Sequence, residues 1–252
     1  MRAPCSVSVV IPALNEEATV AQVVRAALSD EPAEVVVIDA DSRDATAARA
    51  REAGARVLNW REALPGVEPV PGKGESLWRG VAATAGEVVV FLDADLTAPA
   101  PGMVRALSEP FDDPAVALVK ADYARLLGGR RGAGGRVTEL TAKPLLRALF
   151  PQLAHVRQPL GGEYAIRRGV AVELPFVAGY GVEAGLLIDV ALRHGAGAIA
   201  QVDLGARRHR NRPLEELGPM ADVVAATILD RAGVGGASVP QRPPLSGRWK
   251  SE

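Results

Sequence analysis

The residues Glu87-Val88-Val89-Val90-Phe91-Leu92 form a short apolar run that ends in Asp93-Ala94-Asp95. Two earlier runs have the same form, since Val7 to Ile11 ends at Pro12 and Val35–Ile38 ends at Asp39. Continuous apolar, β-branched runs of this length are typical of strands that are buried on both faces, as in parallel sheets. We therefore expect three strands that carry polar residues at their carboxyl ends.

Helical patterns separate these strands. Apolar or alanine-rich residues recur at helical spacing in residues 16–29, 45–53 and 75–85, and Gly54 and Gly86 follow two of these segments as stop signals. The alternation of strands and helices predicts an α/β fold with a doubly wound, mostly parallel sheet that is flanked by helices.

The second half of the chain has a less regular pattern. We expect further strands at 56–58, 116–121, 163–166 and 199–204, a loop at 125–135, and helices at 136–149, 182–194 and 214–232. No internal repeat or linker divides the chain, so we expect one domain over residues 1–232, with halves at 1–110 and 111–232. Residues 233–252 are rich in Gly, Pro, Ser and Arg, which predicts a mobile tail.

The composition excludes several classes of protein. The 252 residues are 48% hydrophobic and 23% charged, with a net charge of −1, so no global field recruits nucleic acid or an anionic membrane. The single Cys5 excludes an intramolecular disulfide and a multi-cysteine zinc site. The sequence holds no run of about 20 apolar residues, and from residues 1–6 we expect no signal peptide. We therefore expect a soluble cytoplasmic protein with no membrane or nucleic-acid partner.

Asp93 and Asp95 form the sharpest motif in the chain. In an extended segment, residues two apart point to the same side, and neighbouring carboxylates repel each other unless a cation neutralises them. Their hard oxygens suit Mg²⁺ or Mn²⁺, which also bind diphosphates. An Asp-x-Asp pair can instead cap a turn, but its place at a strand end favours a metal site.

Two further segments suit the binding of a nucleotide. Asp39, Asp41 and Ser42 follow the second strand, where acidic residues often accept hydrogen bonds from a base or ribose, although they could also cap the next helix. Gly72-Lys73-Gly74 precedes a helix, and Lys73 offers a point charge to a phosphate or base. The spacing is not that of a Walker A motif, and a simple turn is the alternative.

Two basic segments suit an anionic ligand. Gly134-Gly135-Arg136-Val137-Thr138 combines glycines, a guanidinium and a hydroxyl at an expected helix start, which favours an anion site over a solvated loop. His209 lies among four arginines in residues 207–212, which favours the neutral imidazole that a metal ligand requires. A solvated basic loop is the alternative for this segment.

Two glycine-rich loops place an acid next to an aromatic residue. They are Gly161-Gly162-Glu163-Tyr164 and Gly179-Tyr180-Gly181-Val182-Glu183. Such loops bind sugar hydroxyls through carboxylates and ring packing, but they also occur as plain turns.

These motifs together resemble a known family. Residues 9–17 and the Asp93-Ala94-Asp95 triplet are similar to those of nucleotide-sugar glycosyltransferases with the GT-A fold. Residues 72–75, 135–139, 158–164, 179–183 and 209–214 narrow the resemblance to the glucosyl-3-phosphoglycerate synthases. The resemblance covers about residues 7 to 230. It implies a Rossmann-like GT-A sheet with a nucleotide-sugar half at 1–110 and an acceptor-binding half at 111–232.

The resemblance implies a reaction and a set of partners. Members transfer glucose from an NDP-glucose, usually UDP-glucose, to the 2-hydroxyl of 3-phospho-D-glycerate with retention, and they use Mg²⁺ or Mn²⁺. A homodimer is implied as well. The diphosphate is then the leaving group whose charge the metal offsets. No second carboxylate stands out as a nucleophile, so we expect front-face transfer, in which the leaving phosphate helps to deprotonate the acceptor.

The resemblance also implies roles for individual residues. Asp95 and His209 are the expected metal ligands, and Asp95, Glu183 and Lys73 are the expected catalytic residues. The acceptor is expected at Gly135, Arg136, Val137, Thr138 and Asn211. The nucleotide sugar is expected at Pro12, Ala13, Leu14, Glu16, Asp41, Ser42, Lys73, Asp93, Ala94, Gly162 and Tyr180.

Several alternatives stay open at this stage. Asp41 stands where the wider superfamily often has glycine or another small residue, so both UDP and GDP donors are possible. A mannosyl-3-phosphoglycerate synthase that uses GDP-mannose is the first alternative, and a GT-A transferase with a different acceptor is another. A non-catalytic sugar-nucleotide-binding module would tolerate the loss of Asp95 or His209, but both are present.

Overall fold

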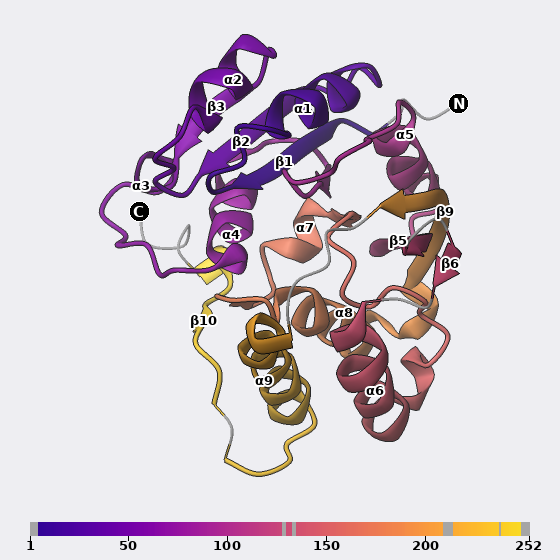
Figure 1. Ribbon diagram of the computed structural model, residues 1–252. Helices are drawn as coiled ribbons and strands as arrows, with labels where there is room; N and C mark the ends of the chain where they lie inside the picture. The colour runs from indigo at the N-terminus through magenta and orange to yellow at the C-terminus, as the bar shows by residue number, and fades with distance from the viewer. Residues whose placement is uncertain (1–4, 128–129, 133–134, 209–213, 237, 248–252) are drawn as a thin grey trace.

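One mixed sheet forms the centre of the protein. The computed structural model describes residues 5–127, 130–132, 135–208, 214–236 and 238–247. In these residues the strand order is β3-β2-β1-β4-β7-β5-β6, and β9 pairs with β5 outside this path (Figure 1). The strands are β1 (Val7–Ala13), β2 (Glu34–Asp39), β3 (Arg56–Asn59), β4 (Val88–Phe91), β5 (Leu118–Leu127), β6 (Arg130–Gly132), β7 (Tyr164–Arg167) and β9 (Ile199–Arg208).

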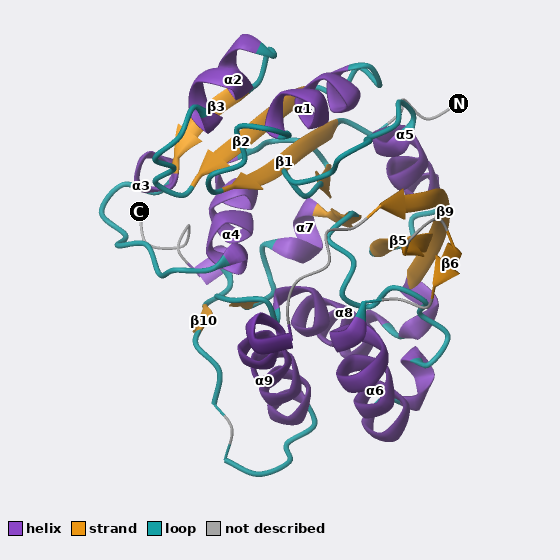
Figure 2. Cartoon of the chain, viewed as in Figure 1, coloured by secondary structure: helices purple, strands orange, loops and turns teal. Residues whose placement is uncertain are grey.

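The predicted sheet is confirmed in its first half. Strands β3, β2, β1 and β4 pair in parallel, and β9 runs parallel to β5. The strand β7 runs antiparallel to both β4 and β5, and β6 runs antiparallel to β5. The α/β architecture with a mostly parallel sheet between helices is therefore the observed one (Figure 2).

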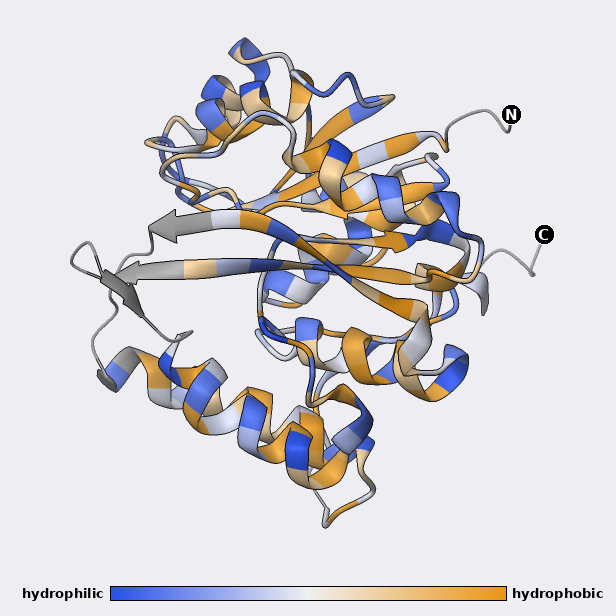
Figure 3. Cartoon of the chain, turned by 90° about the vertical axis from the view of Figure 1, so that its right-hand side faces the viewer, coloured by the Kyte–Doolittle hydropathy of each residue, from blue (hydrophilic) through white to orange (hydrophobic). Residues whose placement is uncertain are grey.

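Helices cover both faces of this sheet. They are α1 (Val20–Leu28), α2 (Thr46–Glu52), α3 (Trp60–Ala63), α4 (Lys73–Ala83), α5 (Met103–Ser108), α6 (Lys143–Leu149), α7 (Arg168–Ala171), α8 (Val182–His194) and α9 (Leu214–Arg231). Val9 and Ile11 of β1 pack in one cluster with α1, α2 and α5, whereas Val10 packs in another with α4, α6, α8 and α9. Alternate strand residues point to opposite faces, which explains the continuous apolar runs. In Figure 3 the strands are hydrophobic over much of their length, and the helices carry both kinds of residue.

Several boundaries differ from the predicted ones. The first helix begins at Val20 rather than at Glu16, because residues 15–17 donate backbone hydrogen bonds to side chains of the 42–46 loop. Strand β5 continues to Leu127 and β6 follows, where a loop over 125–135 was predicted, and β9 extends to Arg208. The expected helix at 136–149 contains a π-helical turn at Thr138–Ala142. The short helices α3 and α5 lack an amphipathic pattern long enough to predict them.

The segment that we expected as a mobile tail makes ordered contacts in residues 238–247. The strand β10 (Gln241–Arg242) pairs with β8 (Phe176–Val177), and Leu245 is buried. Its anchors are Arg242, which pairs with the buried Glu75, and the carbonyl of Pro243, which accepts from Trp78. These partners lie far away in the sequence, so a Gly- and Pro-rich composition does not reveal them.

Candidate active site

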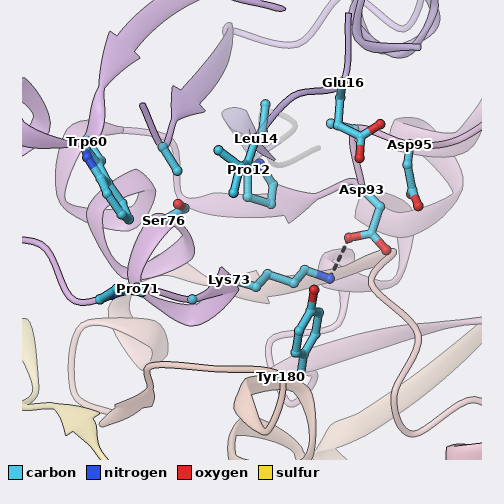
Figure 4. Close-up of a pocket in the computed structure, with 14 residues that line it drawn as sticks. Pro12, Leu14, Glu16, Trp60, Pro71, Lys73, Ser76, Asp93, Asp95 and Tyr180 are labelled. Carbon is cyan, nitrogen blue, oxygen red and sulfur yellow. Dashed lines mark ion pairs between the residues drawn. The ribbon is translucent and has the colours of Figure 1, made fainter. Parts of the chain in front are cut away.

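A cavity lies at the carboxyl ends of β1, β2 and β4. Its volume is about 350 Å³, and it is lined by Pro12, Ala13, Leu14, Glu16, Ala40, Trp60, Pro71, Gly72, Lys73, Ser76, Asp93, Ala94, Asp95 and Tyr180. Figure 4 shows the carboxylates of Glu16, Asp93 and Asp95 at one end, Trp60 at the other, and the Lys73 side chain reaching between them. Ligands of open α/β sheets bind at this edge, which makes the cavity the candidate active site.

Most residues that we predicted for the nucleotide sugar line this cavity. They are Pro12, Ala13, Leu14, Glu16, Lys73, Asp93, Ala94 and Tyr180. Sequence reasoning missed Trp60 and Ser76 as lining residues. Trp60 directly follows β3, which runs parallel to β2, so the rule that ligands bind at carboxyl ends of strands could have found it.

Lys73 connects two acidic residues from different elements. Its Nζ lies 2.5 Å from Asp93 Oδ1, which follows β4, and 2.6 Å from Glu183 Oε1 in the first turn of α8. Burial disfavours the charged ammonium, but the two carboxylates favour it more strongly and raise the pKa of Lys73 well above its ordinary value. A cation at the first residue of a helix opposes the helix dipole, and these carboxylates offset that cost.

Gly162 packs against the carboxylate of Asp93. A Cβ atom at Gly162 would lie 2.1 Å from Asp93 Oδ2, so only glycine leaves room for this carboxylate. Gly162 does not line the cavity. Its contact with the ligand stays a prediction, and the structure indicates a role in placing Asp93.

The Asp41–Ser42 loop lies beside the cavity rather than on its lining. Asp41 has a φ of +63°, a conformation in which glycine is favoured, and Asn59 Nδ2 donates to its Oδ1 at 2.8 Å. That hydrogen bond contributes most to lowering the pKa of Asp41. Ser42 Oγ accepts from the backbone N–H of Asn15 at 2.9 Å. The loop therefore supports the strand ends, and its contact with a base stays a prediction.

The predicted acceptor segment begins a helix, as expected. Arg136 is exposed, whereas Val137 and Thr138 are buried. None of them lines the cavity, so their role stays a prediction. Asn211 and His209 lie outside the described residues.

The predicted metal site is only partly within the described residues. Asp95 lines the cavity, and its carboxylate oxygens fit a hard divalent ion. Within the described ranges, which exclude His209, no group of three His, Cys, Asp or Glu side chains could hold a metal. Asp95 lies with Asp93 and Glu16 at one end of the cavity (Figure 4), and its role as a metal ligand stays a prediction.

One buried charged residue, Lys120, was not predicted. Lys120 on β5 is buried, its Nζ donates to the carbonyl of Gly161 at 2.6 Å, and it lies 4.4 Å from the centre of the Tyr164 ring. Burial raises the pKa of Tyr164 well above its ordinary value, with a further contribution from Glu183. Lys120 lies in the apolar run at 116–121, so its pattern predicted only a strand.

Comparison with known proteins identifies the family. The model of glycosyl transferase family 2 matches residues 8–157. Glucosyl-3-phosphoglycerate synthase of Mycobacterium tuberculosis (strain CDC 1551 / Oshkosh) is 51% identical over 243 residues, which are 91% of this chain and 74% of that protein. The chain belongs to glycosyl transferase family 2 and, within it, to the glucosyl-3-phosphoglycerate synthases.

Other relatives agree with this assignment. The glucosyl-3-phosphoglycerate synthase of Petrotoga mobilis (strain DSM 10674 / SJ95) is 40% identical over 239 residues, which cover 89% of this chain and 73% of that protein. A crystal structure of the M. tuberculosis synthase with Mn²⁺, UDP-glucose and phosphoglyceric acid has a TM-score of 0.90 at 47% identity, covering 97% of this chain and 91% of that one. The resemblance inferred from the motifs is therefore confirmed, as is the GT-A type of sheet.

Proposed function

We propose that this glucosyl-3-phosphoglycerate synthase transfers glucose from UDP-glucose to the 2-hydroxyl of 3-phospho-D-glycerate, releasing UDP. The main support is the near full-length match to the M. tuberculosis enzyme. One crystal structure of that enzyme contains UDP-glucose and phosphoglyceric acid, and another contains UDP and glucosyl-3-phosphoglycerate. The relatives are named for glucosyl transfer, which favours UDP-glucose over the GDP-mannose alternative.

The cavity suggests how the donor lies. Pro12 and Ala13 end β1, Leu14 follows them, and Trp60 closes the far end, so this part of the cavity suits the base and ribose. The diphosphate then lies near Asp93 and Asp95, where Lys73 reaches (Figure 4). A divalent ion held by Asp95 and His209 would supply positive charge to the leaving diphosphate.

We infer that Glu183 orients the sugar rather than attacking it. Its carboxylate is buried and ion-paired with Lys73 at 2.6 Å, and such pairing weakens a nucleophile. In the transfer step, the bond from the glucose C1 to the phosphate oxygen breaks as the acceptor 2-hydroxyl oxygen bonds to C1 on the same face. The departing phosphate oxygen takes the hydroxyl proton. A covalent glucosyl ester on Glu183 in a trapped reaction would contradict this step.

The acceptor carries negative charge on its phosphate and carboxylate. We propose that the acceptor binds at the start of a helix, since backbone amides and a guanidinium suit phosphate. The residues are Gly135, Arg136, Val137 and Thr138, together with Asn211.

The homodimer and the cytoplasmic location are proposals as well. The family resemblance supports the homodimer, and the single Cys5 supports a reducing compartment such as the cytoplasm. No helix among the described residues is long and apolar enough to span a bilayer. Light scattering on the purified protein tests the dimer.

Turnover assays test the proposed reaction. We expect release of UDP from UDP-glucose to require 3-phosphoglycerate and Mg²⁺ or Mn²⁺, with much slower reaction of ADP-glucose and GDP-mannose. The substitution Asp95→Asn keeps the side-chain volume but removes the charge, and it should lower kcat by about 100-fold or more. The control Asp113→Asn lies in a remote turn and should retain activity. Full activity of Asp95→Asn would contradict the metal assignment, and preferred use of GDP-mannose would contradict the donor.

A further inference from the structure

Lys120 is a buried lysine that the proposed mechanism does not use. It lies on β5 opposite Tyr164 of β7, is 1% exposed, and does not line the cavity. An ammonium group in the interior is unfavourable unless hydrogen bonds and opposite charges compensate its lost hydration. The groups around Lys120 therefore show which carboxylates and carbonyls its ammonium group serves.

A hydrogen bond of Lys120 holds the turn that packs against Asp93. Its Nζ donates to the carbonyl oxygen of Gly161 at 2.6 Å and lies over the Tyr164 ring. The next residue, Gly162, packs directly beneath the Asp93 carboxylate, where no Cβ would fit. Lys120 thus fixes the backbone turn that supports the acidic partner of Lys73.

The charges around Lys120 belong to the same cluster. Glu163 and Glu183 are 1% and 4% exposed, and both carboxylates, with that of Asp93, attract the Lys120 ammonium, whereas Lys73 repels it. Lys73 is ion-paired with Asp93 and Glu183, and Lys120 is attracted by all three carboxylates. Without Lys120, this cluster would lose one positive charge near the end of the cavity that is proposed to receive a diphosphate.

We propose that Lys120 is a positioning residue for the donor, which holds the Gly161–Gly162 turn against Asp93 and offsets the negative charge of Glu163 and Glu183. The proposal rests on the proposed function, because the donor is the ligand that benefits. We expect its loss to affect the donor rather than the acceptor, because Lys120 holds the carbonyl of Gly161 and interacts electrostatically with Asp93 and Lys73 at the donor end.

The test compares UDP binding by Lys120→Met and Lys120→Arg, measured by titration calorimetry with Mn²⁺. Methionine keeps the length of the side chain but removes its charge, and loss of a charged hydrogen bond should raise the Kd of UDP by about tenfold or more. Arginine keeps the charge and should recover part of the affinity. The control Arg56→Met also removes an ion pair and a carbonyl contact, but at the edge strand β3, and it should bind UDP as the wild type does.

The kinetic readout separates positioning from a merely structural role. We expect Lys120→Met to raise KM for UDP-glucose and leave KM for 3-phosphoglycerate unchanged. A lower kcat with both KM values unchanged, or wild-type UDP affinity, would overturn the proposal. If Lys120→Met fails to fold, the Lys120 ¹³Cε resonance of the wild type must shift on saturation with UDP and Mg²⁺, and an unmoved resonance overturns it. A wild type that binds no UDP would instead refute the proposed function.

Discussion

At the residue scale, Lys73 and Lys120 lie in one cluster of charged side chains, yet their pKa values shift in opposite directions. Burial lowers both, but Lys73 touches two carboxylates, which raise its pKa well above the ordinary value. Lys120 touches a carbonyl and a ring, so burial lowers its pKa to about 8. A hydrogen bond to a carbonyl and a π contact therefore stabilise charge less than direct ion pairs do here.

A titration of the lysine signals checks this difference. The chain has only four lysines, so ¹³Cε spectra assigned with Lys→Arg variants resolve them. We expect the Lys120 signal to titrate with a midpoint of about 8, and the Lys73 signal to stay in its protonated form at that pH. The groups that face Lys120 are Glu183 on α8, Lys73 on α4, Glu163 before β7, Asp93 after β4 and Tyr164 on β7. A Lys120 midpoint above 10 would contradict the expectation.

The same shift predicts a pH-dependent stability. The native pKa of Lys120 lies below its unfolded value of 10.5, so the native state releases the proton first as the pH rises. The unfolding free energy of the wild type minus that of Lys120→Met should therefore be constant below pH 8 and increase between pH 8 and 10.5. The increase should reach about 3 kcal/mol. Urea unfolding at several pH values measures it, and a difference that does not change over this range would contradict the assignment.

At the element scale, helix α4 packs unusually close to β8. A Cβ atom at Gly74 would lie 1.8 Å from the carbonyl oxygen of Val177, and Glu75 N donates to the carbonyl of Ala178 at 3.3 Å. The substitution Gly74→Ala should push α4 away from β8, destabilise the protein by about 1–3 kcal/mol and weaken UDP binding, because Lys73 begins the same helix. Urea unfolding and calorimetry measure both effects.

A glycine in an open position serves as the control for this substitution. Gly218 lies in α9, and a Cβ atom added there would meet no other atom within 4 Å, so Gly218→Ala should be neutral or stabilising by up to about 1 kcal/mol. Gly74→Ala with wild-type stability would show that α4 has room to move.

The elements that the sequence predicted well are those with local patterns. The runs ending at Pro12, Asp39 and Asp93 predicted the three strands and the edge at which the cavity lies, because burial on both faces leaves a continuous apolar signature. Lys120 and Arg242 could not be placed in this way. Each acquires its role from partners distant in the sequence, and no local period records such contacts.

At the scale of the whole molecule, the C-terminal segment joins the two walls of the cavity. Arg242 on β10 makes two hydrogen bonds to the fully buried Glu75 of α4, at 2.6 and 2.9 Å, and its guanidinium lies 5.3 Å from the centre of the Trp78 ring. The same segment pairs with β8, which leads to Tyr180. Residues 238–247 therefore connect α4, which carries Lys73, with β8 and the loop that carries Tyr180, and they fix the two sides of the cavity relative to each other.

This arrangement predicts a long-range effect of Arg242→Met. Arg79 remains as a partner of Glu75, so the loss should be a moderate destabilisation of about 2 kcal/mol rather than the full cost of an unpaired buried charge. The backbone amide of Ala178, which donates to Pro240 at 2.9 Å, should exchange with solvent faster, and UDP should bind more weakly. Hydrogen exchange and calorimetry measure these changes. Arg242→Lys keeps a positive charge but cannot make the paired hydrogen bonds, so its stability and UDP affinity should lie between those of the wild type and Arg242→Met. Unchanged exchange at Ala178 in Arg242→Met would show that β10 is held by its strand pairing alone.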